Sequence, residues 1–316
     1  MSVSGQGFTK NNEWSRWTIV PAESAGSRPR SAGPDLLRAI AILLVMLWHV
    51  PRASRLDAFE GLRMFSWTGV DLFFVLSGFL IGTQLFTPIA RHQRPSLREF
   101  YLKRSFRILP AFLVVLALYK FVPVLSEGDA LQPMWRFLTF TMNFGLDYRA
   151  TGAFTHAWSL CVEEHFYLIL PALALLLSRL GRRGWTLLIA GVLLCGGMIL
   201  RALLWIPMGA AEAADASFSF APEYLKAIYY PTYCRLDGLL FGVLLAAYRC
   251  FHPEHWRRYA DPRLTLCLGL MCIVASCFLF HFPSASFVGG PSLSFVGLSS
   301  AIRCSRWVAL FFCRRR

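Results

Sequence analysis

Three ionisable residues stand at helical spacing in one apolar stretch, which runs from Asp35 to His49. Arg38 and His49 are eleven residues apart, about three helical turns, so their side chains point the same way. Asp35 precedes Arg38 by three residues and lies close to that face. An imidazole titrates near neutral pH and can take a proton from a hydroxyl group, which makes His49 a candidate general base. Because charged groups are costly to bury in lipid, we expect this face to meet a protein interior or a wet cavity.

The composition is that of a polytopic helical membrane protein. Of the 316 residues, 56% are hydrophobic and only 16% are charged, and the mean hydropathy is +0.49. The net charge of +14 could suggest a nucleic-acid partner, but the basic residues lie in short loops between apolar runs, as they do in cytoplasmic loops. The nine cysteines lie mostly in apolar segments without a CxxC pair. We interpret them as reduced packing residues and expect no metal site.

The apolar runs predict an all-α fold, a polytopic bundle of about eight spanning helices. We place these spans at about 35–50, 66–87, 108–125, 157–178, 185–206, 225–248, 264–282 and 291–312. Segment 133–147 is short and interrupted by Arg136 and Asn143, so we take it as interfacial or re-entrant. With this choice most Lys and Arg residues fall on the side of both chain ends, which the positive-inside rule assigns to the cytoplasm.

Ahead of the spans, residues 1–33 are polar and predict a disordered cytoplasmic tail, followed by a transmembrane domain over 34–316. The last predicted span is interrupted by Arg303 and Arg306.

Five motifs, in order along the chain, resemble those of the acyltransferase 3 family of integral membrane acyltransferases. The first helix has the family's basic residue, ten further residues and a histidine, here Arg38 and His49. The other four are Gly69-Val-Asp-Leu-Phe-Phe-Val-Leu-Ser-Gly-Phe-Leu-Ile81, Tyr101-Leu-Lys-Arg-Ser-Phe-Arg-Ile-Leu-Pro110, Trp158-Ser-Leu-Cys-Val-Glu-Glu-His-Phe-Tyr167 and Arg235-Leu-Asp-Gly238. One departure is His165, where the family usually has Gln. A second is the end of the chain, because the family typically has about ten spans.

The resemblance implies an enzyme in which His49 is catalytic and acyl-CoA is a co-substrate, with no bound cofactor. It also implies that Lys103, Arg104 and Arg107 bind the acyl donor, and Arg104 and Arg107 share a helix face that suits one polyanion, such as the phosphates of a CoA thioester. The alternative is that these three follow the positive-inside rule and contact lipid headgroups. Arg38 would steady a phosphate, a thioester oxygen or a carboxylate, or would simply pair with Asp35.

Asp71 is a carboxylate inside an apolar helix, and such acids are usually functional. It could orient or charge-balance His49, or it could cap its helix near Gly69. The sequence leaves both possibilities open.

Glu163 is the second catalytic candidate among the acids. It is a better inward-facing residue than Glu164, because Ser159 and Tyr167 flank it one turn away on either side. A carboxylate there could steady the imidazole of His49.

Six more residues are predicted to contact substrate or to hold the fold together. Arg235 and Asp237, about midway into the 225–248 helix, cannot face each other and each need a partner on another helix. The glycine pairs Gly78/Gly82 and Gly238/Gly242 predict close helix packing. The six are Asp35, Trp158, Ser159, Tyr167, Arg235 and Asp237.

The sequence therefore predicts a multi-pass membrane O-acyltransferase that moves an acyl group, most simply acetyl, from acyl-CoA to a hydroxyl of a glycan or other envelope or small-molecule acceptor. We expect it in the bacterial inner membrane, among lipid and without a nucleic-acid partner. A transporter is the alternative from another class, because intramembrane Arg, Asp and His can line a permeation path, although no inverted repeat is visible. An inactive, C-terminally truncated acyltransferase is the third possibility.

Overall fold

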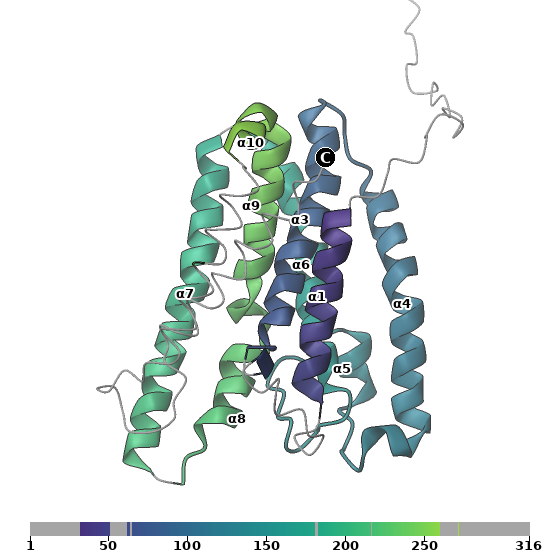
Figure 1. Ribbon diagram of the computed structural model, residues 1–316, viewed down its shortest axis with the longest axis vertical. Helices are drawn as coiled ribbons and strands as arrows, with labels where there is room; N and C mark the ends of the chain where they lie inside the picture. The colour runs from purple at the N-terminus through teal and green to yellow at the C-terminus, as the bar shows by residue number, and fades with distance from the viewer. Residues whose placement is uncertain are drawn as a thin grey trace, which may run out of the picture.

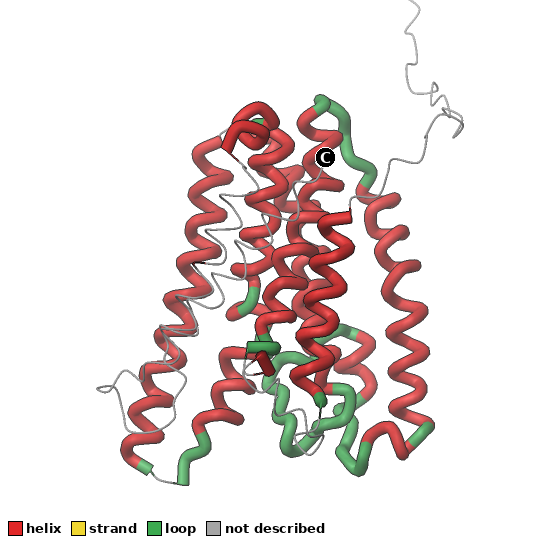
Figure 2. Tube along the Cα trace, viewed as in Figure 1, coloured by secondary structure: helices red, strands yellow, loops and turns green. Residues whose placement is uncertain are grey.

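A computed structural model describes residues 32–50, 62–63, 65–180, 183–215, 217–259 and 271. Within these ranges every regular element is a helix and no strand occurs, so the predicted all-α fold is confirmed there (Figure 2). The long helices are α1 (Ala32–His49), α3 (Thr68–Ala90), α4 (Leu97–Phe121), α6 (Trp158–Leu180), α7 (Arg183–Ala214) and α9 (Leu236–Phe251). They lie roughly alongside one another (Figure 1).

The short helices mark the two ends of this bundle. α5 (Met134–Leu138) and α8 (Phe220–Tyr224) lie at one end, and α10 (Pro253–Tyr259) lies at the other (Figure 1). Segment 133–147 contributes only the five residues of α5 as α-helix, too few to cross a membrane, which agrees with its exclusion from the predicted spans.

Glycines bring α3 and α9 into close contact at the centre of the bundle. A Cβ atom added at Gly78 would lie 2.0 Å from the backbone oxygen of Leu239, and one at Gly242 would lie 2.1 Å from that of Val75. Only hydrogen fits at these positions, so the two GxxxG pairs act in helix packing, as predicted.

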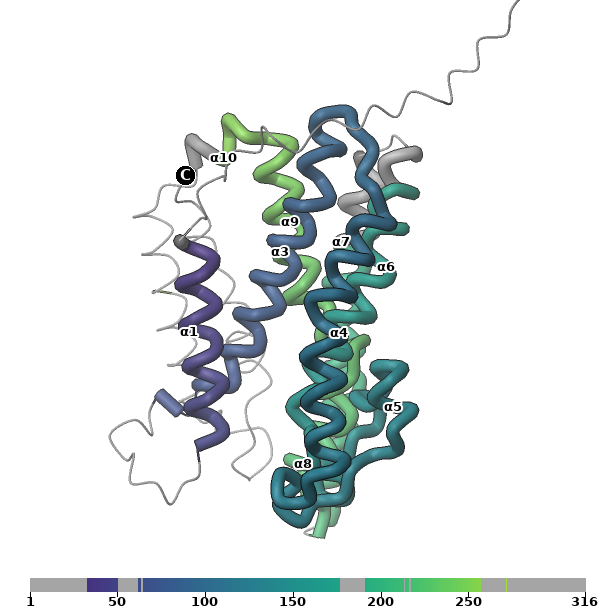
Figure 3. The backbone as a smooth tube through the Cα atoms, turned by 90° about the vertical axis from the view of Figure 1, so that its right-hand side faces the viewer, coloured from purple at the N-terminus to yellow at the C-terminus, as the bar shows by residue number. Residues whose placement is uncertain are grey.

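α1 also packs against α3. Leu37 and Ala41 of α1 are fully buried. A Cβ atom at Gly69 of α3 would lie 2.8 Å from the backbone oxygen of Ala41. In the view of Figure 3, α1 lies on one side of α3 and α9, with α4, α6 and α7 on the other.

The start of α4 differs from the prediction, which placed the helix at about 108. The helix begins at Leu97, because Ser96 caps it by accepting a hydrogen bond from the backbone N–H of Glu99 at 3.3 Å. Ser96 and Glu99 have the Ser-x-x-Glu spacing of a capping box. Lys103, Arg104 and Arg107 are therefore on the helix itself.

The predicted helix over 225–248 is interrupted. α8 continues as a π-helical turn, Leu225–Tyr229, and α9 starts only at Leu236. Pro231 lies in the break, where it has no N–H to continue the helical hydrogen bonds and its own backbone is extended, with a ψ of 138°. Arg235 and Asp237 thus lie at the beginning of α9 rather than midway along a helix.

Three described helical segments are long and apolar enough to cross a membrane: Thr68–Ala90, Thr155–Leu176 and Gly191–Glu212. Apart from residue 271, the predicted spans at 264–282 and 291–312 lie outside the described residues, and so does the tail up to residue 31. The count of about eight spans and the cytoplasmic position of both ends remain predictions.

Candidate active site

His49 ends α1, and the helix itself fixes its ring. The Nδ1 atom lies 2.8 Å from the backbone oxygen of Val45, one turn earlier. Because a carbonyl oxygen only accepts hydrogen bonds, Nδ1 carries the proton of the neutral ring and Nε2 keeps a free lone pair. The side chain is exposed. His49 therefore has the tautomer and the access that a general base needs.

Arg38 forms an ion pair within α1. Its Nη1 atom lies 2.9 Å from Oδ1 of Asp35, and the two side chains are 33% and 55% exposed. This is the pairing that the sequence offered as an alternative to substrate contact. It also aims the guanidinium, so the pair is compatible with both roles.

Asp71, in the first turn of α3, is buried and paired with Arg235 at the start of α9. The Oδ1 atom of Asp71 accepts a hydrogen bond from Nη2 of Arg235 at 2.8 Å, and the two side chains are only 3% and 2% exposed. The sequence offered two roles for Asp71, a contact with His49 or a helix cap. The contact seen is a different one, because the carboxylate pairs with Arg235 and so joins α3 to α9.

Aromatic rings surround the Arg235 guanidinium on its other sides. Its Cζ atom lies 4.8, 5.6 and 5.7 Å from the ring centroids of Tyr229, Trp158 and Phe74. The faces of such rings attract a cation, and more strongly when water is excluded. Trp158 thus packs beside the Arg235 guanidinium. Of the two roles predicted for Trp158, substrate contact or structural support, this position favours structural support.

A second buried ion pair joins α7 to α9. Nη2 of Arg201 lies 2.8 Å from Oδ2 of Asp237, and Nη1 donates to the backbone oxygen of Cys234 at 3.0 Å. Arg235 and Asp237 thus have partners on other helices, as predicted. Arg201 was not among the predicted site residues, although a single Arg inside the apolar run 185–206 was a visible signal.

Glu163 faces α3 and α4 rather than α1. Its Oε1 atom accepts from the hydroxyl of Ser77 at 2.9 Å, and its Oε2 atom accepts from the hydroxyl of Tyr167 at 2.7 Å. Nη2 of Arg104 lies 3.6 Å from the same Oε2. The inward orientation predicted for Glu163 is seen, but its described partners do not include His49.

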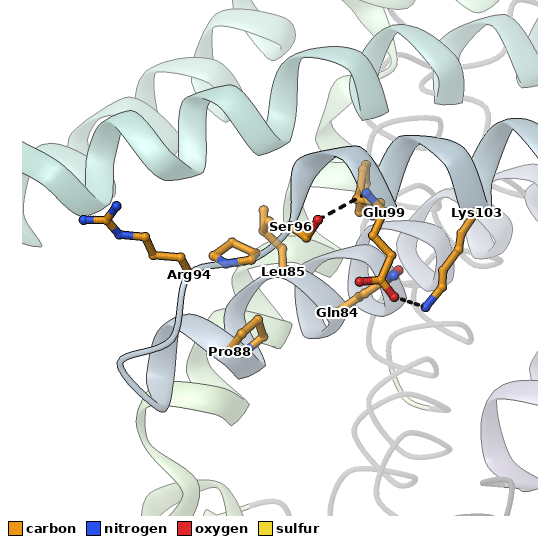
Figure 4. Close-up of a pocket in the computed structure, with 9 residues that line it drawn as sticks. Gln84, Leu85, Pro88, Arg94, Ser96, Glu99 and Lys103 are labelled. Atoms are coloured by element: carbon orange, nitrogen blue, oxygen red, sulfur yellow. Dashed lines mark hydrogen bonds and ion pairs between the residues drawn. The ribbon is translucent and has the colours of Figure 1, made fainter. Parts of the chain in front are cut away.

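The basic residues of α4 point to different places. Lys103 pairs with Glu99 one turn earlier and lines a pocket of about 380 Å³, where the end of α3 meets the start of α4 (Figure 4). Arg104 faces Glu163 instead, and Arg107 is exposed. The pocket is lined by Gln84, Leu85, Pro88, Arg94, Pro95, Ser96, Glu99, Phe100 and Lys103.

His165 belongs to a polar chain near the α5 end of the bundle. Its Nδ1 atom lies 2.8 Å from Oγ1 of Thr232, which accepts from the side-chain amide of the buried Asn143 at 2.9 Å. The hydroxyl of Ser159 donates to the backbone oxygen of His156 at 3.4 Å. Ser159 therefore makes a local helix contact, whereas Tyr167 takes part in the contacts of Glu163.

A family profile described as an acyltransferase domain matches residues 31–313, nearly the whole chain. The chain belongs to this acyltransferase family. The resemblance of its five motifs is thereby confirmed, and so is the enzyme class that they predicted.

Curated relatives agree with this assignment. The acyltransferase is similar to the peptidoglycan O-acetyltransferase OatA of Listeria monocytogenes, with 30% identity over 230 residues, or 67% of this chain and 33% of the relative. It is similar to the O-acetyltransferase OatA of Staphylococcus aureus, with 29% identity over 230 residues, or 68% of this chain and 34% of the relative. An uncharacterized protein of Haemophilus influenzae is 32% identical over 192 residues, 57% of this chain and 74% of the relative.

The chain spans about a third of the length of the two OatA relatives. No solved structure matches it.

The acyltransferase therefore has its predicted site residues in several separate groups rather than one. His49 ends α1 toward the α5 end of the bundle, whereas the pocket with Lys103 lies at the α10 end (Figure 1). The pairs of Asp71 and Glu163 connect helices between these two ends. The described residues thus hold a candidate base and a candidate donor pocket on opposite ends of one helical bundle.

Proposed function

We propose that this acyltransferase moves an acetyl group from acetyl-CoA to a hydroxyl group of a cell-envelope glycan. The family and the relatives support acyl transfer, and the printed name of the Listeria relative supports a glycan acceptor. The observation that carries the proposal is the fixed ring of His49, whose Nδ1–H is bound to Val45 and whose Nε2 has no hydrogen-bond partner among the residues that the structure describes, while the residue itself is exposed.

His49 would act as the general base. Its Nε2 atom takes the proton of the acceptor hydroxyl while the hydroxyl oxygen attacks the thioester carbonyl carbon. The C–S bond then breaks, the acetyl group stays on the acceptor oxygen, and the CoA thiolate leaves and takes up a proton. The Val45 carbonyl keeps the ring in the productive tautomer and stabilises the imidazolium that forms.

The donor would enter from the other end of the bundle. The pocket beside Lys103 has the size of a small-molecule site and carries basic groups for phosphate oxygens. Arg104 and Arg107 continue the positive charge along α4, and Arg38, aimed by Asp35, would steady a phosphate of the donor. We place the chain in the bacterial inner membrane as a multi-pass protein, with this pocket on the cytoplasmic side.

The test is transfer of radiolabel from acetyl-CoA to envelope glycans, using membranes that carry equal amounts of each variant. We expect His49→Ala to lose at least about 100-fold in rate, the usual contribution of a general base. His252→Ala removes another exposed histidine, at the junction of α9 and α10, and serves as the matched control. Equal labelling by wild type and His49→Ala would exclude His49 as the base. Flux of protons or solutes without any label transfer would favour a transporter.

A further inference from the structure

Four side chains from three helices form a polar cluster in the apolar part of the bundle. Ser77 comes from α3, Arg104 from α4, and Glu163 and Tyr167 from α6. Glu163 receives hydrogen bonds from Ser77 and Tyr167 and lies 3.6 Å from Arg104, whose side chain is only 18% exposed. We call these four residues the α3–α4–α6 cluster.

Arg104 is held in one orientation within this cluster. Its Cζ atom lies 3.3 Å from the ring centroid of Tyr167, so the planar guanidinium is stacked on the ring. The same ring donates its hydroxyl to Glu163, which fixes both the stack and the carboxylate. The stack sets the plane of the guanidinium, and the ion pair with Glu163 sets its direction.

This arrangement leaves hydrogen-bonding capacity on Arg104. Its Nε atom is buried and makes no hydrogen bond to any part of the chain that the structure describes. The contact with Glu163, at 3.6 Å, is longer than a hydrogen bond. The Arg104 guanidinium is thus held in one plane, its Nε–H group has no described partner, and its ion pair with Glu163 is long. These features suit it to bind a second anion.

Arg104 lies next to the pocket. Phe100, one turn earlier on α4, and Lys103, the preceding residue, both line it. Arg104 itself does not line the pocket, but it shares a helix face with Phe100, so a phosphate oxygen that enters past Phe100 would reach Arg104 and compete with Glu163 for it.

We propose that Glu163 sets the affinity for the acyl donor, by competing with the donor's phosphate oxygens for Arg104, and that Ser77 and Tyr167 hold Glu163 in this position. The inference rests on the proposed function, because it takes the donor to be a CoA thioester. Without donor, Glu163 neutralises a guanidinium that would be costly to leave alone in an apolar layer. When the donor binds, its phosphate neutralises Arg104 instead of Glu163. Displacing Glu163 costs free energy, and this cost weakens donor binding. Glu163 is thus a positioning residue for Arg104.

The test is equilibrium binding of radiolabelled acetyl-CoA to the full chain purified in detergent. Glu163→Gln keeps the shape and the acceptor oxygen but removes the competing charge. We expect the Kd for acetyl-CoA to fall by roughly 1.5- to fivefold, the range for loss of one partly exposed competing ion pair. Arg104→Gln should raise the Kd. In the Arg104→Gln background, Glu163→Gln should have no further effect.

Two more variants keep the result interpretable. Glu127→Gln removes an exposed acid in the loop after α4, away from the cluster, and its Kd should equal that of wild type. Glu163→Asp keeps the charge but draws the carboxylate back from Arg104, so it should lower the Kd by a smaller factor even if Glu163→Gln folds poorly. A merely structural role predicts no tighter binding in any variant.

The outcomes separate this inference from the proposed function. If wild type binds acetyl-CoA and Glu163→Gln and Glu163→Asp bind it equally or more weakly, the competition is disproved while the enzyme assignment stands. The same fold-change with and without Arg104 would also disprove it. If wild type neither binds acetyl-CoA nor shows label transfer that depends on His49, the proposed function fails, and this inference fails with it.

Discussion

Between α3 and α9, the ion pair joins residues that are 164 positions apart and almost fully buried, whereas on α1 and α4 the pairs join residues one turn apart that are exposed. Asp71 and Arg235 are 3% and 2% exposed. Lys103 and Glu99 are 65% and 60% exposed. Both regions pair an acid with a base, but the central pair is buried and the edge pairs are exposed to water. The pair of Arg104 and Glu163 is intermediate in exposure, at 18% and 16%.

Burial decides what each pair can do. A charge inside an apolar layer must keep its partner, because nothing else nearby replaces lost hydration. An exposed pair contributes little to stability because water and salt screen it. Residues at the centre therefore hold α3, α7 and α9 together, and residues at the edges remain available to a ligand. This suggests that candidate substrate contacts in this acyltransferase should be sought at α1 and α4.

The largest stability effect is expected from breaking the central pair. Asp71→Asn keeps the shape of the side chain but leaves the Arg235 charge buried without its counter-ion. Removal of one partner from a buried pair costs about 3–5 kcal/mol. We expect a marked loss of folded protein and a lower midpoint of thermal unfolding in detergent. Asp35→Asn, which removes the exposed partner of Arg38, is the control and should unfold close to wild type. Equal unfolding midpoints for Asp71→Asn and wild type would show that burial is not what distinguishes the two regions.

The next effect concerns the glycine contact that brings the central helices together. Gly242→Ala places a methyl group 2.1 Å from the backbone oxygen of Val75, so α3 and α9 must move apart. Overpacking of this kind costs about 1–3 kcal/mol. Gly191→Ala on α7 meets no atom within 4 Å and should be neutral or gain up to about 1 kcal/mol from helix propensity. Thermal unfolding of the two variants side by side gives the comparison, and a similar loss in both would contradict it.

The fold could be predicted where the apolar pattern is long and unambiguous. Helices α1, α3, α6 and α7 were expected from their hydrophobic runs, and 133–147 was correctly kept out of the set of spans. The two errors have identifiable causes. The Ser96–Glu99 capping box started α4 about ten residues early, and Pro231 divided a run that hydropathy alone reads as one helix. The Ser96–Glu99 spacing and Pro231 are both visible in the sequence. A hydropathy window misses them because it averages over many residues.

The site could be predicted only in part, for a different physical reason. The local pair of Arg38 with Asp35 follows from helical spacing, which the sequence shows directly. The partners of Asp71 and Glu163 depend on which helices pack together and how each is rotated. The sequence named Arg235 as a residue in need of a partner on another helix, but several acids met that description. Arg201 was overlooked because a single Arg inside an apolar run does not show which helix its side chain faces, although its presence there was a visible signal.

The smallest effect is expected at the edge of the bundle, and it sharpens the comparison. Glu99→Gln removes the one-turn pair with Lys103, both of whose side chains are exposed. Such a pair on a helix surface contributes about 0.3–0.5 kcal/mol, and salt reduces that further. We expect the midpoint of thermal unfolding to stay within the error of the measurement at physiological salt and to fall slightly at low salt. Because Glu99 and Lys103 both line the pocket, the variant leaves an unpaired ammonium group there. If Glu99→Gln instead lost as much stability as Asp71→Asn, exposure would not explain the difference between the edge pair and the central pair.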